Sequence, residues 1–268
     1  MSLNVSIVLY NHPLSEIAPL VETLRKSEMV SDIFLIDNSP KKNLEFESLK
    51  AFYHFNGKNI GYGAAHNIAI RQTIEQNIPF HLVINPDISF EPSILKKIEK
   101  YMNNNTDIGQ LMPKVYYPNG EIQYLCKLLP TPFDLIFRRF LPQKWTQKRT
   151  EKFEMRASGF NKTIDVPYLS GCFMFLRTSA LKEVGLFDER FFMYPEDVDL
   201  TRRIHGKFRT VFSPEVSVVH HHAQGSYTNT KLLIIHSMNM IKYFNKWGWI
   251  FDKERRKINR EISKQLND

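Results

Sequence analysis

The densest group of acidic residues in the chain is formed by Glu196, Asp197 and Asp199, which follow an aromatic run and precede two arginines. A carboxylate beside a hydrophobic wall is shielded from water, so one of these acids is a candidate general base. The same residues also fit the acidic first turn of a helix, in which Asp199 pairs with Arg203 four residues later. Composition alone leaves both interpretations open.

Another carboxylate, Asp87, follows the apolar run His81–Ile84 in the turn Asn85-Pro86-Asp87. A carboxylate held at a strand end can bind a hard divalent cation that also bridges a diphosphate. The alternative is a structural N-cap for the helix that follows. This turn therefore predicts either a metal ligand or a helix cap.

Three histidines, His220 to His222, end another apolar run. Neighbouring side chains of a strand point to opposite faces, so at most two of the three face one site, which argues against a zinc triad. One imidazole that joins a carboxylate-bound cation fits this spacing, and exposed strand-end histidines are the alternative.

Two further motifs lie nearer the N-terminus. Asp37 ends the run Ile33–Ile36, where its carboxylate either accepts hydrogen bonds from a base or ribose or forms an Asx-turn. Gly61 and Gly63 stand at an expected helix start, where free N–H groups and the helix dipole favour phosphate. His66 occupies a position where a dinucleotide-binding fingerprint requires glycine, so a plain turn is the alternative there.

The elements that must position these motifs follow from hydrophobic periodicity. Strands are expected at Val5–Tyr10, Ile33–Ile36, Phe52–Phe55, His81–Ile84, Gln110–Val115, Val166–Arg177, Arg209–Ser213 and Val216–His220. Helices are expected at Glu16–Lys26, Ala64–Gln76 and Pro92–Asn103 and from Ser179. This alternation predicts an α/β fold with a mixed, mostly parallel central sheet flanked by helices. Ligands bind beyond the carboxyl ends of such strands, where Asn11, Asp37, Asn38 and Asn85 are expected to lie.

Two segments do not follow this alternation. The stretch from about 126 to 162 is rich in aromatic and basic residues without a clean period, and it is interpreted as an inserted lobe. Residues 228–268 read as a helical extension with a break at Trp247-Gly248-Trp249, and they are expected to cover one edge of the domain.

Composition limits the classes of partner. The 268 residues include 36 Lys and Arg against 28 Asp and Glu, a net charge of +8, which favours nucleotide diphosphates, nucleic acid or an acidic membrane face. Cys126 and Cys172 are the only cysteines and form no CxxC pattern, which predicts reduced thiols in the cytosol. Without a basic leader or an apolar run of about 18 residues, the chain is expected to be neither secreted nor integral.

Seven segments in a fixed order give the strongest indication: SIVLYN, IDNS, NIGYGAAHN, INPD, LSGCFMFLR, GLFDERFFMYPEDVDLTRR and VVHHHAQGS. Over roughly residues 5–227 the chain resembles inverting glycosyltransferases of family 2, especially their rhamnosyltransferase-like branch. The resemblance implies a GT-A (Rossmann-like) domain over 1–227. Its nucleotide-sugar half would span about 1–115 and its acceptor half about 163–227.

Roles on the acceptor and metal side follow from this resemblance by position. Asp197 matches the catalytic base, with Glu196 beside it. Asp87 matches the metal ligand, for Mg²⁺ or Mn²⁺, whereas Asn85 replaces the first acid of the Asp-x-Asp motif in many relatives. His221 best matches the histidine that helps to hold the cation or diphosphate, and His220 is the alternative.

On the donor side, the resemblance makes Asp37 a nucleoside contact, with Asn11 and Asn38 as neighbours. It places Gly61, Ala65 and Asn67 near the donor, and Asn67 is expected to make a polar contact. The implied reaction is a single displacement in which the base takes the proton of the acceptor hydroxyl while that oxygen attacks the anomeric carbon.

The expected partners are a dTDP- or UDP-sugar donor, with rhamnose as the sugar, and a glycan or lipid-linked saccharide acceptor. The expected location is cytoplasmic, at the inner face of the membrane. There the basic insert, together with Lys242, Trp247, Trp249 and Arg255, would contact anionic lipid, unless these residues form an ordinary solvated face.

Two rival functions remain at this stage. One is a nucleic-acid-binding module, which would use Arg138, Arg139, Lys144, Trp145, Lys148 and Arg149. No nucleic acid is expected, because that module leaves the strand-end carboxylates unexplained. The other rival is an inactive scaffold of the same fold, against which the presence of both Asp87 and Asp197 argues.

Overall fold

Three apolar-rich runs in the first third of the chain form neighbouring parallel strands that are buried on both faces, as such runs predict. The computed structural model describes residues 1–136, 141–221 and 230–266. The first elements are β1 (Leu3–Leu9), α1 (Leu14–Arg25), β2 (Val30–Asp37), a 3-10 helix η1 (Leu44–Ser48), β3 (Phe52–Phe55), α2 (Tyr62–Glu75) and β4 (Phe80–Ile84). Strand β1 pairs in parallel with both β2 and β4, and β2 pairs in parallel with β3.

The second half of the chain extends the same sheet. Its elements up to the tail include β5 (Ile88–Ser89), α3 (Ser93–Asn104), β6 (Ile108–Tyr116), β8 (Ile164–Asp165), β10 (Phe173–Arg177), α6 (Thr178–Val184), α7 (Glu196–His205) and β11 (Arg209–His220). The nine-stranded sheet has the order β3-β2-β1-β4-β10-β6-β11-β5, with β8 beside β11. Strand β10 is antiparallel to both of its neighbours, so the sheet is mixed. The α/β architecture predicted from the alternation is confirmed.

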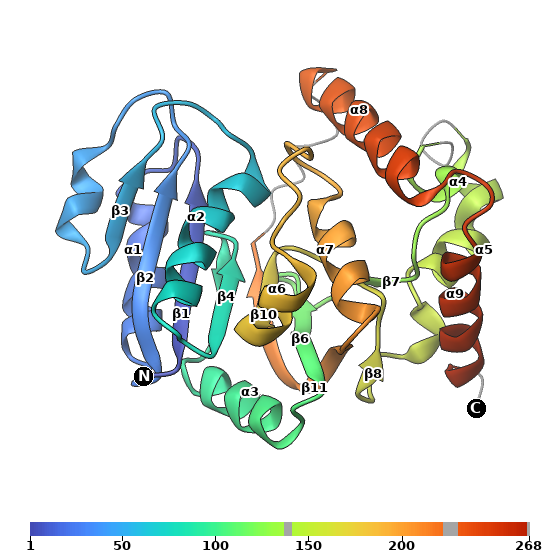
Figure 1. Ribbon diagram of the computed structural model, residues 1–268, viewed down its shortest axis with the longest axis horizontal. Helices are drawn as coiled ribbons and strands as arrows, with labels where there is room; N and C mark the ends of the chain where they lie inside the picture. Colours follow the sequence, from blue (N-terminus) through green and yellow to red (C-terminus); the bar gives the residue numbers. More distant parts are fainter. Residues whose placement is uncertain (137–140, 222–229, 267–268) are drawn as a thin grey trace.

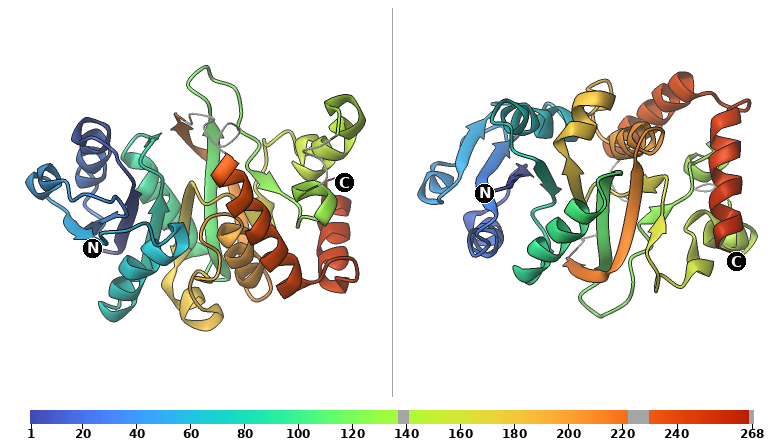
Figure 2. Two further views of the ribbon diagram at one scale, coloured as in Figure 1. Left: turned by 90° about the horizontal axis from the view of Figure 1, so that it is seen from above. Right: turned by 60° about the horizontal axis from the view of Figure 1, so that its bottom comes forward.

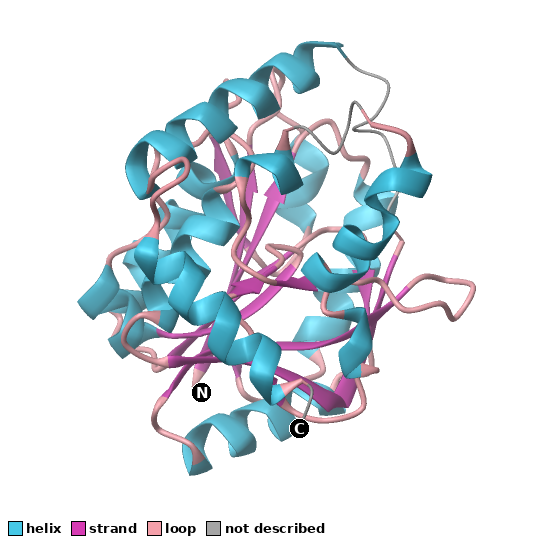
Figure 3. Ribbon diagram, turned by 90° about the vertical axis from the view of Figure 1, so that its right-hand side faces the viewer, coloured by secondary structure: helices cyan, strands magenta, loops and turns pink. Residues whose placement is uncertain are grey.

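Helices cover both faces of this sheet (Figures 1 and 3). On one face, α1 and α3 contribute Ile17, Leu24, Leu95 and Ile98 to the largest hydrophobic cluster. On the other face, α2, α6 and α7 pack against β4 and β10 through a second cluster. The carboxyl ends of β1, β2 and β4 are thereby left at one edge of the sheet, where the predicted site residues follow them.

The predicted strand boundaries were wrong at two places. The run Val166–Arg177 is divided into β9 (Tyr168–Leu169) and β10 by a turn that contains Gly171. The runs Arg209–Ser213 and Val216–His220 instead form the single strand β11, which absorbs the intervening residues through a register shift against β6. The first deviation places the backbone N–H of Gly171 beside Asp197.

The insert and the tail lie together at one end of the molecule, beyond the edge of the sheet (Figure 2). The insert contains β7 (Cys126–Lys127), α4 (Pro132–Leu135), α5 (Gln143–Phe153) and the 3-10 helix η3 (Arg156–Ser158), and the tail forms α8 (Thr230–Trp247) and α9 (Lys253–Gln265). The predicted break near Trp247 is thus confirmed. No helix in the described part of the chain has the length and apolarity needed to span a bilayer.

Candidate active site

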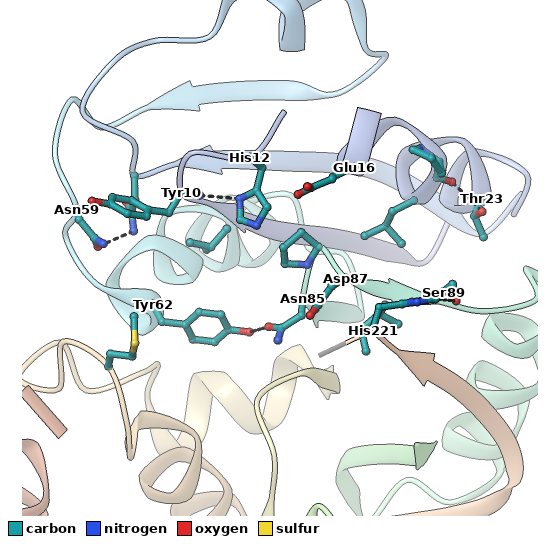
Figure 4. A pocket seen from close by; sticks show the side chains of 17 residues that line it. Tyr10, His12, Glu16, Thr23, Asn59, Tyr62, Asn85, Asp87, Ser89 and His221 are labelled. Atoms are coloured by element: carbon teal, nitrogen blue, oxygen red, sulfur yellow. Dashed lines mark hydrogen bonds between the residues drawn. The ribbon is translucent and has the colours of Figure 1, made fainter. Parts of the chain in front are cut away.

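A pocket of about 740 Å³ opens at the carboxyl ends of β1, β2 and β4 (Figure 4). Its lining includes four of the residues predicted from the sequence, namely Asn38, Asn85, Asp87 and His221. Residues of the β1–α1 loop and of α1 form the opposite wall, among them Tyr10, His12 and Glu16. The pocket lies where the topology of an open α/β sheet places ligands.

The Asp87 carboxylate faces His220 rather than His221. Its Oδ1 atom lies 3.2 Å from Nε2 of His220, and Asn85 Nδ2 lies 3.5 Å from the same nitrogen. The His220 side chain is 6% exposed, whereas that of Asp87 is 37% exposed. The Asp87 carboxylate thus lies at the rim of the pocket, and the imidazole of His220 lies beneath it.

Gln123 fixes the tautomer of this imidazole. Its side-chain amide nitrogen donates to the carbonyl oxygens of His220 and Tyr116, at 2.9 and 3.4 Å, so its oxygen faces His220 Nδ1 at 2.9 Å. That oxygen can only accept, so Nδ1 carries the hydrogen and the Nε2 lone pair of a neutral ring points towards Asp87. A lone pair and a carboxylate oxygen at this distance need a positive charge, supplied by a proton on Nε2 or by a cation.

His221 occupies a different environment. Its Nε2 contacts Ser89 Oγ at 2.9 Å, and its backbone N–H donates to the carbonyl oxygen of Asp87. The side chain is exposed at the pocket wall. The alternative residue, His220, therefore fits the role of metal ligand better than the preferred one, because the alternation along β11 turns these neighbours apart. His222 lies outside the described residues.

Within residues 1–136, 141–221 and 230–266, no three His, Cys, Asp or Glu side chains gather as a complete metal cage. Asp87 and His220 form a two-residue set at the pocket. Carboxylate and imidazole are donors that Mn²⁺ and related cations accept, and further positions would be filled by water or by a diphosphate. The donor set fits a cation shared between protein and substrate.

Asp197 lies at the first turn of α7 and is held by main-chain donors. Its Oδ2 accepts from the N–H of Gly171 at 2.9 Å, and its Oδ1 accepts from the N–H of Val198 at 2.8 Å. Burial raises the pKa of Asp197 above its usual range, and these two hydrogen bonds oppose the increase. The helix-start and general-base interpretations are compatible here, because the helix start itself positions the carboxylate.

Glu196, next in the chain, is buried. Its Oε2 has no hydrogen-bond partner among the described residues. Burial, with a smaller contribution from the charge of Asp197, raises the pKa of Glu196 well above its usual range. Ionisation is therefore disfavoured more strongly at Glu196 than at Asp197.

Tyr62 connects the two acidic regions and was missed as a functional residue in the sequence. Its hydroxyl lies 2.9 Å from Asn85 Oδ1 and 2.8 Å from the carbonyl oxygen of Gly171 (Figure 4). Burial is the largest cause that raises the pKa of Tyr62 well above its usual range, so the hydroxyl remains a donor. Its place in the glycine motif was visible, but its partners come from turns that are distant in sequence.

Asn38 lines the pocket directly after the end of β2. Its amide nitrogen contacts Asn59 Oδ1 and the carbonyl oxygen of Gly61, and its oxygen accepts from Asn56 Nδ2 at 2.8 Å. Asn11 has a positive φ of 56° and is exposed next to this region, anchored by its N–H to Ser39 Oγ.

Asp37 is fully buried and both of its carboxylate oxygens accept hydrogen bonds from the protein. Oδ1 accepts from the N–H of Ser39 at 2.9 Å and Oδ2 from the hydroxyl of Tyr53 at 2.7 Å. The Asx-turn interpretation is therefore confirmed. A nucleoside contact stays a prediction, which would use the remaining lone pairs of these oxygens.

Three residues predicted near the donor serve the packing around α2 instead of lining the pocket. Gly61 has a φ of 96°, and a Cβ there would collide with the backbone of Phe192. Ala65 is fully buried against Phe34 and Ile36. Asn67 is also buried, and its amide group exchanges two hydrogen bonds with the backbone of Phe187, at 2.9 and 3.0 Å. These residues position the loop before α7, because α2 and that loop pack together.

Comparison with known proteins agrees with this geometry. No family model matches the chain. The chain is 31% identical over 189 residues to the N-acetylglucosaminyl-diphospho-decaprenol L-rhamnosyltransferase of Mycobacterium tuberculosis, covering 63% of this chain and 58% of that protein. It is 25% identical over 236 residues to the rhamnosyltransferase WbbL of Escherichia coli K12, covering 83% of this chain and 86% of WbbL. The chain is thus similar in sequence to named rhamnosyltransferases over most of its length.

Solved glycosyltransferase structures share the fold of this chain. GalNAc-T7 with UDP, GalNAc and Mn²⁺ superposes with a TM-score of 0.67 at 15% identity, over 92% of this chain and 48% of that chain. TarS of S. aureus superposes with a TM-score of 0.61 at 17% identity, over 98% of this chain and 43% of that chain. The chain spans 58% and 61% of the curated mycobacterial and Haloferax volcanii relatives.

Proposed function

We propose that the chain transfers a sugar from a nucleoside-diphosphate donor to a hydroxyl group of a cell-surface polysaccharide or lipid-linked glycan precursor, with inversion at the anomeric carbon. One continuous set of contacts carries this proposal, and it runs through Asp197, Gly171, Tyr62, Asn85, His220 and Asp87. It joins a shielded carboxylate, suited to accept a proton, to a carboxylate–imidazole pair suited to hold a cation.

In the proposed reaction, Asp197 accepts the proton of the acceptor hydroxyl as that oxygen attacks the anomeric carbon. The bond from that carbon to the diphosphate breaks on the opposite side, so the configuration inverts without a covalent sugar intermediate. Two main-chain hydrogen bonds hold the Asp197 carboxylate in place, which supports its role as base. The protonated neighbour Glu196 keeps a second negative charge away from the site.

Asp87 and His220 would hold a divalent cation, Mg²⁺ or Mn²⁺. When bound, such a cation neutralises the negative charge that develops on the leaving diphosphate. The Gln123 contact supports this role, because it presents the unprotonated nitrogen of His220 towards Asp87.

The donor and acceptor are proposed from the relatives. The mycobacterial relative is named as a rhamnosyltransferase acting with a diphospho-decaprenol, and WbbL is named as a rhamnosyltransferase. We therefore infer a rhamnose donor linked to dTDP, with UDP-hexoses as the alternative, and a lipid-linked saccharide as acceptor. The reaction is placed in the cytoplasm, at the inner face of the membrane.

Calorimetric titration tests the donor site directly. The full chain is titrated with UDP and with dTDP, each with and without Mn²⁺, alongside Asp87→Ala and the control Asp107→Ala. Asp107 is 61% exposed and lies 3.6 Å from Arg209, away from the pocket lining. Because Asp87 faces the pocket and Asp107 does not, only Asp87→Ala is expected to lose the metal-dependent part of binding.

A preference for dTDP in the wild type would support rhamnose as the sugar. Absence of nucleotide binding in the wild type under every condition would overturn the proposed function. Equal metal-dependent binding in the wild type and in Asp87→Ala would instead indicate that the metal binds elsewhere than at Asp87.

A further inference from the structure

Helix α8 has two different faces. Its inner face buries Met240, Tyr243 and Phe244 in a cluster with Phe191 and Val198, the residues that flank the start of α7. These contacts fix the helix on the loop that leads to the candidate base. The helix is therefore a firmly attached part of the acceptor half.

The outer face of α8 carries large apolar side chains that no part of the described chain covers. Ile234, Met238 and Ile241 are 57%, 55% and 46% exposed, and their spacing of four and three residues places them in one stripe. After the helix, Ile250 and Phe251 are 65% and 86% exposed in the turn before α9. We call Ile234, Met238, Ile241, Trp249, Ile250 and Phe251 the outer stripe.

Basic side chains border the outer stripe. The exposed ones from α8 to α9 are Lys242, Lys253, Arg256, Lys257, Arg260 and Lys264. The exposed acids of this region are Glu254, which pairs with the buried guanidinium of Arg202 at 2.9 Å, and Glu261, so the basic side chains outnumber them. The surface thus combines apolar side chains with excess positive charge, the composition of a helix that lies in the interface of an anionic bilayer.

Two residues expected at such a surface from sequence lie inside the protein. Trp247 stacks against Arg202, whose guanidinium carbon is 3.9 Å from the ring centre, and its indole N–H donates to Asp199. Arg255 is buried and donates to the carbonyl oxygens of Pro130 and Trp249. The exposed residues of the turn before α9 and the basic residues in the first two turns of α9 take their place on this surface.

We propose that the outer stripe docks the protein on an anionic phospholipid bilayer, with Ile250 and Phe251 inserted between lipids and the basic side chains on the phosphate groups. This inference rests on the proposed function, because it supplies the surface on which a lipid-linked acceptor is presented. A second copy of the chain is a poorer occupant. A symmetric contact through this surface would bring identical lysines and arginines together.

The packing of α8 connects this surface to the chemistry. Asn239, on the inner side, donates to the carbonyl oxygen of Met193, and the ring of His236 contacts Tyr194 at 5.2 Å between ring centres. Both partners belong to the loop that ends at Glu196 and Asp197. Docking through the outer stripe therefore sets the height of the base above the bilayer.

Co-sedimentation of the full chain with vesicles tests the proposal. One set contains phosphatidylcholine alone and the other equal parts of phosphatidylcholine and phosphatidylglycerol. The variants are I250S/F251S and K253E/K257E. Their controls are Leu44→Ser, whose side chain is 63% exposed on η1 in the nucleotide half, and K50E/K58E, which changes the net charge equally.

We expect the wild type to bind only the vesicles that contain phosphatidylglycerol. I250S/F251S and K253E/K257E, here called the stripe variants, should each lower the partition coefficient by about tenfold or more. The controls should stay within about twofold of the wild type. UDP and dTDP binding, measured in parallel, should be unchanged in all four variants.

Equal vesicle binding by the stripe variants and their controls, or none by the wild type, would overturn this inference. So would a wild-type dimer in light scattering that I250S/F251S dissociates, since the stripe would then be covered by a second copy. Nucleotide binding distinguishes these outcomes from failure of the proposed function, which would appear as loss of binding in the wild type.

Discussion

The turns after β2 and β4 look alike in sequence but differ in structure. Each follows a buried parallel strand and carries an aspartate beside an asparagine or proline. Both carboxylate oxygens of Asp37 accept hydrogen bonds, one from Ser39 and one from Tyr53. Burial, together with the hydrogen bond to Asp37, raises the pKa of Tyr53 to about 12. Asp87 instead faces an imidazole at the rim of a pocket.

This difference shows that position at a strand end selects candidates but does not assign their roles. The partner differs: a tyrosine from the neighbouring strand makes Asp37 part of the fold, whereas the histidine of β11 leaves Asp87 partly exposed at the pocket. The adjacent pair Glu196 and Asp197 repeats the contrast at shorter range. Five substitutions test it.

The largest effect is expected from Asp197→Asn. An amide cannot accept the proton of the acceptor hydroxyl, so kcat should fall by about 10²- to 10⁴-fold, with nucleotide affinity within about twofold of the wild type. Turnover with a nucleotide sugar and calorimetric titration measure the two quantities. Retention of wild-type kcat would remove Asp197 from the role of base.

The main effect of Asp37→Ala should be on the stability of the fold rather than on nucleotide binding. It leaves the buried N–H of Ser39 and hydroxyl of Tyr53 without their acceptor, so the free energy of unfolding should fall by about 1–3 kcal/mol. Asp87→Ala should change it by less than about 1 kcal/mol, because its carboxylate is partly solvated. Urea denaturation of both variants measures this.

Nucleotide titration of folded Asp37→Ala sharpens the same comparison. Lost affinity would support a direct nucleoside contact in addition to the turn. A fall in stability for Asp87→Ala as large as that for Asp37→Ala would contradict the distinction between the two turns.

Gln123→Ala should weaken the metal-dependent part of nucleotide binding by about tenfold, because His220 loses the acceptor that fixes its tautomer. Gln147→Ala, on the surface of α5, is the matched control. NMR of the histidine ring nitrogens provides a second measurement, since in part of the molecules the hydrogen should lie on Nε2 of His220 rather than on Nδ1. An unchanged tautomer and affinity would make Gln123 a purely structural residue.

The smallest effect is expected from Glu196→Gln, which imitates the protonated side chain and should keep kcat within about threefold. The pKa of Glu196 is raised in the folded state, so the protonated side chain contributes to the stability of the fold at low pH. This contribution is lost as the pH rises from the pKa of the unfolded state, about 4.3, through the pKa of the folded state. Thermal melts across pH should show the Gln variant gaining on the wild type as pH increases. A constant difference would mean that Glu196 is ionised in the fold.

The sequence predicted the sheet, the helices around it and the acids that line its edge, because these depend on local periodicity and on strand ends. It did not predict the break at Gly171, since apolar residues typical of a strand flank Ser170 and Gly171 on both sides. The resemblance favoured His221 over His220 by spacing, whereas the direction of each ring depends on the register of β11 against β5 and β6.

The residues that the sequence missed share one property: their partners are far away in the chain. Tyr62 meets Gly171, 109 residues later, and Gln123 meets His220, 97 residues later. No local pattern marks such pairs, because each side chain alone is also typical of an ordinary helix start or turn. The same holds for the outer stripe, whose apolar spacing resembles that of a buried helix until packing shows which face is covered.

The Gly171 turn has a consequence for how this protein can change over evolution. Its contact with Asp197 is made by a main-chain N–H, which every residue except proline possesses. The orientation of the carboxylate therefore depends on the course of the main chain between β9 and β10 and not on the identity of a neighbouring side chain. Substitutions that keep this turn in place leave the contact intact.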